Sequence, residues 1–78
     1  MGSYSVEFRR SAELELYGVP FPFRRQMSQA LIALQKDARP ADAQLIAGKL
    51  YRLKVHGWTA EYVVDDVSAI VRVTRIYK

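Results

Sequence analysis

The stretch LYRLKVHGWTAEYVV, residues 50–64, alternates apolar and polar side chains on either side of one glycine. The polar members before the glycine, at every second position, are Arg52, Lys54 and His56. Alternation with a period of two predicts a strand with one face buried and the other exposed to solvent. Gly57 marks a turn or bulge, and residues 59–64 continue as a second strand. A β-hairpin is therefore the centre of the predicted fold.

The chain after this hairpin predicts one more strand. Asp65 and Asp66 form a polar turn, and residues 69–77 carry the β-branched side chains typical of a strand. Apolar residues occur at both parities here, since Val71 and Ile76 fall on opposite faces of a regular strand. Parity alone therefore does not show which face of this strand is buried. A bulge in the middle of the strand would move the buried side chains from one parity to the other.

The chain before the hairpin predicts a strand and a short helix. Residues 4–8 alternate with aromatic and β-branched side chains, which indicates a half-buried strand. Ser11 is a candidate N-cap of a helix over Ala12–Tyr17, and Glu13 lies in the first turn, where the helix dipole favours an acid. Gly18 is a candidate left-handed stop.

A second helix is the clearest predicted element. Pro22 suits its first turn, because the missing N–H costs nothing there. The apolar residues form one stripe at helical spacing, namely Phe23, Met27, Ala30, Leu31, Leu34 and Ala38. Arg39-Pro40 ends this helix. Residues 41–48 are compatible with either a turn of helix or a packed loop. The predicted order is β-α-α-β-β-β with a C-terminal meander.

Length and composition bound the class of protein. A length of 78 residues indicates one domain over residues 1–78. The absence of cysteine excludes disulfides, a thiol nucleophile and thiolate zinc sites, and one histidine argues against a histidine-rich metal centre. No apolar run reaches the roughly 20 residues of a membrane span, so the expected compartment is the cytoplasm. Neither a metal nor another cofactor is expected.

The surplus positive charge lies mostly in the C-terminal part of the sequence. The net charge is +4, and residues 49–78 carry six Lys or Arg against three acids, whereas residues 1–48 carry six against five. Successive members of the row Arg52, Lys54 and His56 would stand roughly 6.5–7 Å apart on one sheet face. This spacing suits the phosphates of an extended nucleic-acid strand. An ordinary solvated sheet face explains the same pattern, so both interpretations stay open.

Other residues near this row also allow two interpretations. His56 is a candidate proton carrier or a surface residue beside a turn. Trp58 either stacks on a base or covers one end of the core. Tyr77 and Lys78 either close a basic site beside Arg75 or fray at the end of the strand.

The order of these motifs resembles the RelE/ParE family of toxins from bacterial toxin–antitoxin pairs. The resemblance is carried by Val6-Glu7-Phe8, Ser11-Ala12-Glu13, Leu31-Ile32-Ala33-Leu34, Asp37-Ala38-Arg39-Pro40, the run from Gly48 to Val55, Tyr62-Val63-Val64-Asp65-Asp66, and Val71-Arg72-Val73-Thr74-Arg75-Ile76. Together these segments cover almost the whole chain. The resemblance implies an α+β fold in which two helices pack on a curved, mostly antiparallel four-stranded sheet.

The same resemblance implies partners and an activity. The expected partner is a cognate antitoxin that wraps the toxin. In the RelE-like branch the concave sheet face binds mRNA on the ribosome, and basic residues assist attack of a ribose 2′-hydroxyl on the neighbouring phosphate. Such a site cleaves mRNA without a metal, because cations stabilise the charged transition state. The chain is thus expected to inhibit translation as a ribosome-dependent endoribonuclease, an mRNA interferase.

The resemblance also assigns roles to single residues. Lys54 is the candidate general base or phosphate clamp, and Arg52 is a transition-state stabiliser. The remaining catalytic candidates are His56, Arg75 and Tyr77. The candidates for RNA binding are Lys49, Trp58, Arg72 and Lys78.

Two positions depart from the nuclease branch of the family. RelE-like nucleases usually place an arginine directly after the aromatic that follows the turn glycine, and this chain has Thr59. They also carry an arginine and a tyrosine on a C-terminal extension, for which Tyr77 and Lys78 are only loose substitutes. These departures keep two alternatives open, a ParE-like inhibitor of DNA gyrase without nuclease activity and a degenerate member that only binds antitoxin.

Overall fold

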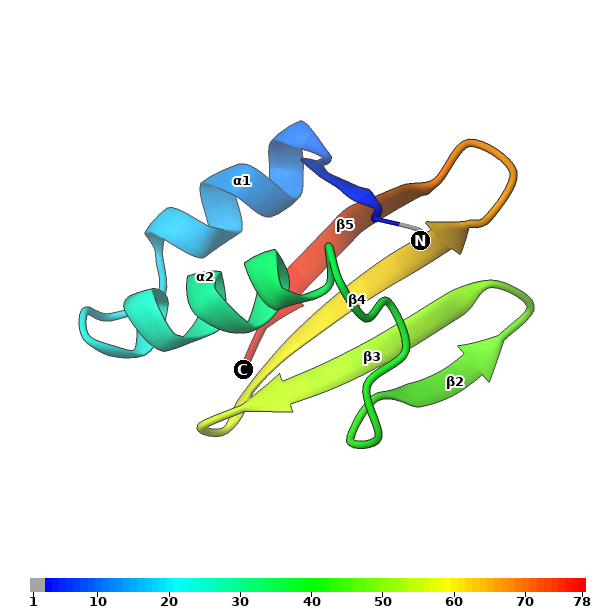
Figure 1. Cartoon of the computed structure of the whole chain (residues 1–78). Coiled ribbons are helices and arrows are strands. Elements are labelled where there is room, and N and C mark those ends of the chain that lie inside the picture. Colours follow the sequence, from blue (N-terminus) through cyan, green and yellow to red (C-terminus); the bar gives the residue numbers. More distant parts are fainter. Residues whose placement is uncertain (1–2) are drawn as a thin grey trace.

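The computed structural model describes residues 3–78, which form two helices and a five-stranded sheet (Figure 1). The elements are β1 (Ser5–Phe8), α1 (Arg10–Tyr17), α2 (Phe23–Ala33), β2 (Gln44–Ala47), β3 (Leu50–Val55), β4 (Trp58–Asp65) and β5 (Ile70–Tyr77). The predicted α+β class and the order of the first elements are confirmed. No helix among these residues is long and apolar enough to cross a membrane.

The strands follow the spatial order β1-β5-β4-β3-β2. Strand β1 runs parallel to β5, and every other neighbouring pair is antiparallel. The last strand, β5, therefore lies beside the first, β1, and strands β2 to β5 form a meander (Figure 1). This places the C-terminal strand inside the sheet, between β1 and β4.

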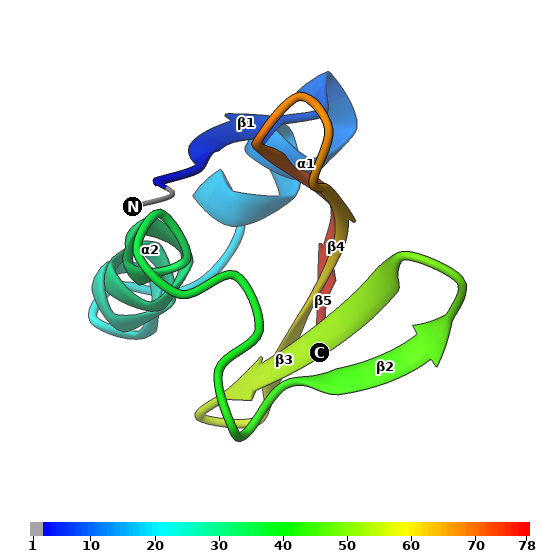
Figure 2. The ribbon, with the colours of Figure 1, turned by 45° about the vertical axis from the view of Figure 1, so that its right-hand side comes forward.

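Both helices cover the same face of the sheet, which is seen almost edge-on in Figure 2. The core lies between these two layers. From the helical segments it receives Ala12, Val19, Met27, Leu31, Leu34 and Ala38, and from the sheet Leu53, Ala60, Tyr62, Val64, Val71, Val73 and Ile76. The opposite face of the sheet has no helix over it (Figure 2).

Helix α2 buries the predicted apolar stripe from Met27 onward, leaves Phe23 at its start exposed, and ends earlier than predicted. Met27 and Leu31 are fully buried, and Leu34 and Ala38 join the core. The helix ends at Ala33 and not at Arg39, because the next amide groups bond three residues back in tighter turns, as Leu34 does to Leu31. The stripe continues past the helix because these turns keep the same side chains over the sheet.

Helix α1 begins and ends with different capping from that predicted. It starts at Arg10, with Arg9 and not Ser11 in the cap position. Glu13 lies in the first turn, as predicted. Gly18 caps the C-terminus with a right-handed φ of −81°, so the predicted left-handed stop is wrong. The Gly18 amide instead closes a tight turn onto the Glu15 carbonyl.

Strand β2 is the element that the sequence did not predict. Its four residues, Gln44–Ala47, are all exposed, and they pair with β3 at the edge of the sheet. Because no side chain there is buried, no alternation marks the segment as a strand. The sheet therefore has five strands instead of four, with β2 held by backbone pairing.

A bulge in β5 explains why the last strand has apolar residues at both parities. Glu61 pairs with Arg75 and Tyr62 pairs with Val73, which leaves Thr74 as the extra residue. The Thr74 hydroxyl donates to the Glu61 carbonyl at 3.2 Å. Val71, Val73 and Ile76 are all buried as a result. The predicted possibility of a bulge is confirmed.

Candidate nucleic-acid interface

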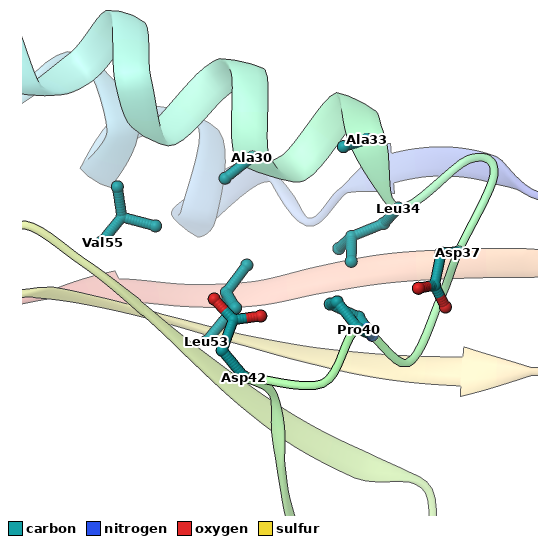
Figure 3. A pocket seen from close by; sticks show the side chains of 8 residues that line it. All are labelled: Ala30, Ala33, Leu34, Asp37, Pro40, Asp42, Leu53 and Val55. Atoms are coloured by element: carbon teal, nitrogen blue, oxygen red, sulfur yellow. The ribbon is translucent and has the colours of Figure 1, made fainter.

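A shallow apolar groove of about 260 Å³ lies between α2, β3 and the connection to β2 (Figure 3). Its lining residues are Ala30, Ala33, Leu34, Asp37, Pro40, Asp42, Leu53 and Val55. The only charged side chains in this lining are two carboxylates, which repel phosphate. This groove is therefore a poor candidate for an RNA site.

The face of the sheet opposite the helices carries the charged side chains, and we call it the open face. Its members are Arg52 and Lys54 on β3, Thr59, Glu61 and Val63 on β4, and Arg72, Arg75 and Tyr77 on β5. Their placement follows from the register, because directly paired residues share a face and the neighbours Leu53, Ala60 and Ile76 are buried under the helices. The predicted basic face of the meander is therefore present.

Glu61 stands in the middle of this face. It pairs across the strands with Arg52 on one side and with Arg75 on the other. The Tyr77 hydroxyl donates a hydrogen bond of 2.6 Å to Glu61 Oε2. This bond to a carboxylate raises the pKa of Tyr77, so the phenol stays protonated and continues to donate.

The two arginines that flank Glu61 are each oriented by a neighbour. The guanidinium of Arg75 lies 4.5 Å from the centre of the Tyr77 ring, within the range of a cation–π contact. Arg52 Nε donates to Gln44 Oε1 at 3.0 Å, so the unpredicted strand β2 supplies the group that holds it. Both guanidinium groups keep further N–H donors for an anion.

Few of the cations on the open face are neutralised by ion pairs. In the part of the chain that the structure describes, the salt bridges join Arg39 to Asp66 and Arg72 to Glu7. Arg52, Lys54 and Arg75 form none there, although Glu61 lies among them. A phosphate can therefore approach these three cations without first displacing a carboxylate from a salt bridge.

His56 does not continue the row of Arg52 and Lys54. Strand β3 ends at Val55, and His56 enters the turn with a positive φ of 51° beside Gly57 at 82°. Its ring lies 5.9 Å from that of Phe23, at the start of α2. The alternation predicted for this residue fails because two left-handed residues reverse the chain there.

The remaining candidates lie toward the two ends of the sheet. Trp58 packs against the core, and Lys78 Nζ lies 5.8 Å from the centre of its ring. Lys49 and Arg72 line a small hollow of about 180 Å³ together with Val63, Asp65 and Ile70. The predicted RNA-binding residues are thus divided between two ends of the sheet.

The sequence interpretation missed Glu61 and Gln44. Glu61 has the same parity as Thr59, so the alternation within residues 58–64 already placed it on the polar face. Its pairing with both arginines depends on the strand register, which the sequence did not determine. Gln44 gave no signal because β2 was not predicted.

The centre of the open face offers the Glu61 carboxylate, three cations that form no salt bridge within residues 3–78, and an anchored phenol. This set of groups can bind a phosphodiester, stabilise additional negative charge on it and accept a proton. Residues 3–78 contain no group of three or more His, Asp or Glu side chains arranged to hold a metal ion. The charged groups of the open face suit acid–base chemistry at a phosphate.

No family model matches the sequence, and no curated protein matches it. Solved structures do match. The isolated E. coli RelE toxin superposes with a TM-score of 0.86 at 23% identity, covering 97% of this chain and 84% of that one. The RelBE2 toxin–antitoxin complex of Mycobacterium tuberculosis gives 0.84 at 15% identity, covering 96% of both chains. The RelE–RelB complex of Pyrococcus horikoshii gives 0.83 at 16%, covering 96% of this chain and 93% of that one. This chain therefore has the fold of the RelE toxins.

Proposed function

We propose that this protein is the toxin of a type II toxin–antitoxin pair, and that it inhibits translation by cutting mRNA on the ribosome. The observation that carries the proposal is the cluster of Arg52, Lys54 and Arg75 on the open face. Family-like sequence motifs and the RelE fold support the same function. The cleavage is metal-independent, because the cations take over the stabilisation of phosphate charge.

In this reaction the ribose 2′-hydroxyl attacks the adjacent phosphorus. Lys54 binds a non-bridging phosphate oxygen as an exposed cation, and Arg52 and Arg75 stabilise the charge that develops as the new bond forms. Because Gln44 and the Tyr77 ring hold the two arginines, little reorganisation is needed when the substrate arrives.

A cognate antitoxin is the proposed protein partner. The RelE chains of M. tuberculosis and P. horikoshii were solved in complex with RelB antitoxins. This chain exposes large apolar side chains that suit such a partner, among them Ile32, Leu45 and Ile46, with 58%, 60% and 42% of their surface accessible.

The alternative is a ParE-like inhibitor of DNA gyrase. Thr59 favours it, because this position on the open face is only 6% exposed and carries no charge where RelE-like nucleases have an arginine. Gyrase-dependent DNA breakage with intact mRNA would establish this alternative.

Replacing Lys54 by Ala tests the nuclease proposal. We expect the cleavage rate on ribosome-bound mRNA to fall about 10²–10³-fold, the effect of removing one donor to a transition-state oxyanion. Lys36→Ala is the matched control, since Lys36 is also exposed but follows α2 in the helical layer. Equal cleavage by the Lys54→Ala and Lys36→Ala variants would contradict the proposed role of the open face.

A further inference from the structure

Glu61 is the carboxylate at the centre of the open face, with Arg52 and Arg75 on either side of it. An acid at this place weakens the binding of RNA, because it repels phosphate. Binding alone therefore gives no account of why it is surrounded by Arg52 and Arg75 and held by Tyr77. A role of Glu61 in proton transfer explains this arrangement.

We propose that Glu61 is the general base of the cleavage reaction, and that it accepts the proton of the ribose 2′-hydroxyl. This inference rests on the proposed nuclease function. Lys54, which is exposed on the same face, then serves as a phosphate clamp only.

The geometry around Glu61 leaves one of its oxygens available. Tyr77 donates to Oε2, and the hydrogen bonds found within residues 3–78 include none to Oε1. Oε2 is thereby fixed, and Oε1 is left to accept a hydrogen bond from the substrate. Glu61 is half-buried, so the protein already replaces part of the water around its side chain. Tyr77 is a positioning residue in this scheme.

The 2′-oxygen forms a bond to phosphorus as its proton passes to Glu61, and the bond from phosphorus to the 5′-oxygen breaks. Water protonates the departing 5′-oxygen, and the resulting hydroxide is neutralised when Glu61 releases its proton to the solvent. The products are a 2′,3′-cyclic phosphate and a 5′-hydroxyl end. Arg52 and Arg75 flank the carboxylate, so they lie beside the phosphate that gains charge.

Glu61→Gln tests this role, because glutamine keeps the shape of the side chain and an oxygen that accepts the Tyr77 bond. We expect kcat for ribosome-bound mRNA to fall on the order of 10²–10⁴-fold, as for the loss of a general base. KM should stay the same or fall, because a negative charge has left the face that binds RNA. If Glu61 only stabilised the fold, its replacement would not lower kcat while KM stayed the same or fell.

Glu7→Gln is the matched control. It removes a carboxylate from the same face of the sheet, where Glu7 pairs with Arg72 on β5. We expect it to keep kcat within about threefold, in line with a surface substitution away from the reacting atoms. The melting temperature of each variant shows whether it is folded.

Tyr77→Phe provides a second test through a double-mutant cycle. If Tyr77 acts by positioning Glu61, the phenylalanine lowers kcat in the wild-type background and changes nothing further in the Glu61→Gln background. Additive losses would overturn the proposed link between these two residues.

The outcomes separate this inference from the proposed function. A Glu61→Gln variant that cleaves at the wild-type rate, while Lys54→Ala is impaired, overturns the role of Glu61 and leaves the nuclease function intact. A folded wild-type protein that cleaves no ribosome-bound mRNA overturns both.

Discussion

Single residues couple segments that lie far apart in the chain. Asp66, in the turn between β4 and β5, accepts hydrogen bonds from Arg39 at 2.7 and 3.2 Å and from the Tyr4 hydroxyl at 2.5 Å. Arg39 follows α2, and Tyr4 precedes β1, so one carboxylate ties three connections together. Arg39 Nε also donates to the Tyr51 hydroxyl at 2.8 Å. The ion pair with Arg39, followed by the bond from Tyr4, lowers the pKa of Asp66.

The lowered pKa of Asp66 predicts an acid-sensitive contribution to stability. Above the unfolded-state pKa of an aspartate, about 3.9, the contribution is fully present. It is lost as pH falls through the lower folded-state pKa, where the native carboxylate takes a proton. We therefore expect Asp66→Asn to be less stable than the wild type at pH 7, and the difference to shrink below about pH 4.

Urea unfolding between pH 7 and pH 2.5 measures this difference. Asp42→Asn is the control, because Asp42 lies in the same connection as Arg39 and forms no salt bridge within residues 3–78. A stability difference between Asp66→Asn and the wild type that stays constant with pH would contradict the contribution assigned to this carboxylate.

At the scale of the element, α2 shows what helical periodicity determines. Leu31 is fully buried against the sheet, while its neighbour Ile32 is 58% exposed. We expect Leu31→Ala to lower the free energy of unfolding by about 2–5 kcal/mol, the range for truncation of a buried leucine. Ile32→Ala should change it by less than about 0.5 kcal/mol. Denaturant titration of both variants checks this, and equal losses would mean that the buried face of α2 is wrongly assigned.

The elements with alternating or helical burial were predictable, and those without it were not. The apolar stripe of α2 and the alternation in β3 and β4 follow from one buried face each. Strand β2 has no buried side chain, so its sequence carries no pattern. For the bulge at Thr74 the sequence indicates only a possibility, because apolar residues occur at both parities of β5.

The sequence predicts the candidate site only where its side chains alternate with buried residues. Arg52 and Lys54 were placed correctly on one face because they alternate with buried residues within β3. His56 was not, since the strand ends one residue before it and the chain reverses. The grouping of Glu61 with Arg75 and Tyr77 depends on the pairing of β4 with β5, which is long-range information.

At the scale of the whole molecule, the two faces of the sheet have separate tasks. One face builds the core with both helices (Figure 2). The other carries Arg52, Lys54, Arg72 and Arg75. Substitutions on the open face can therefore change chemistry with little effect on the core. This separation makes activity and stability measurable independently in the variants proposed above.

The central claim is that the open face cuts mRNA on the ribosome, and incubation of the purified protein with ribosomes programmed with a defined mRNA tests it most directly. We expect new 5′-hydroxyl ends within the message that appear only when ribosomes are present, at a rate that falls about 10²–10³-fold in Lys54→Ala. Intact mRNA after incubation with the folded protein, together with DNA breakage when gyrase is supplied, would contradict it.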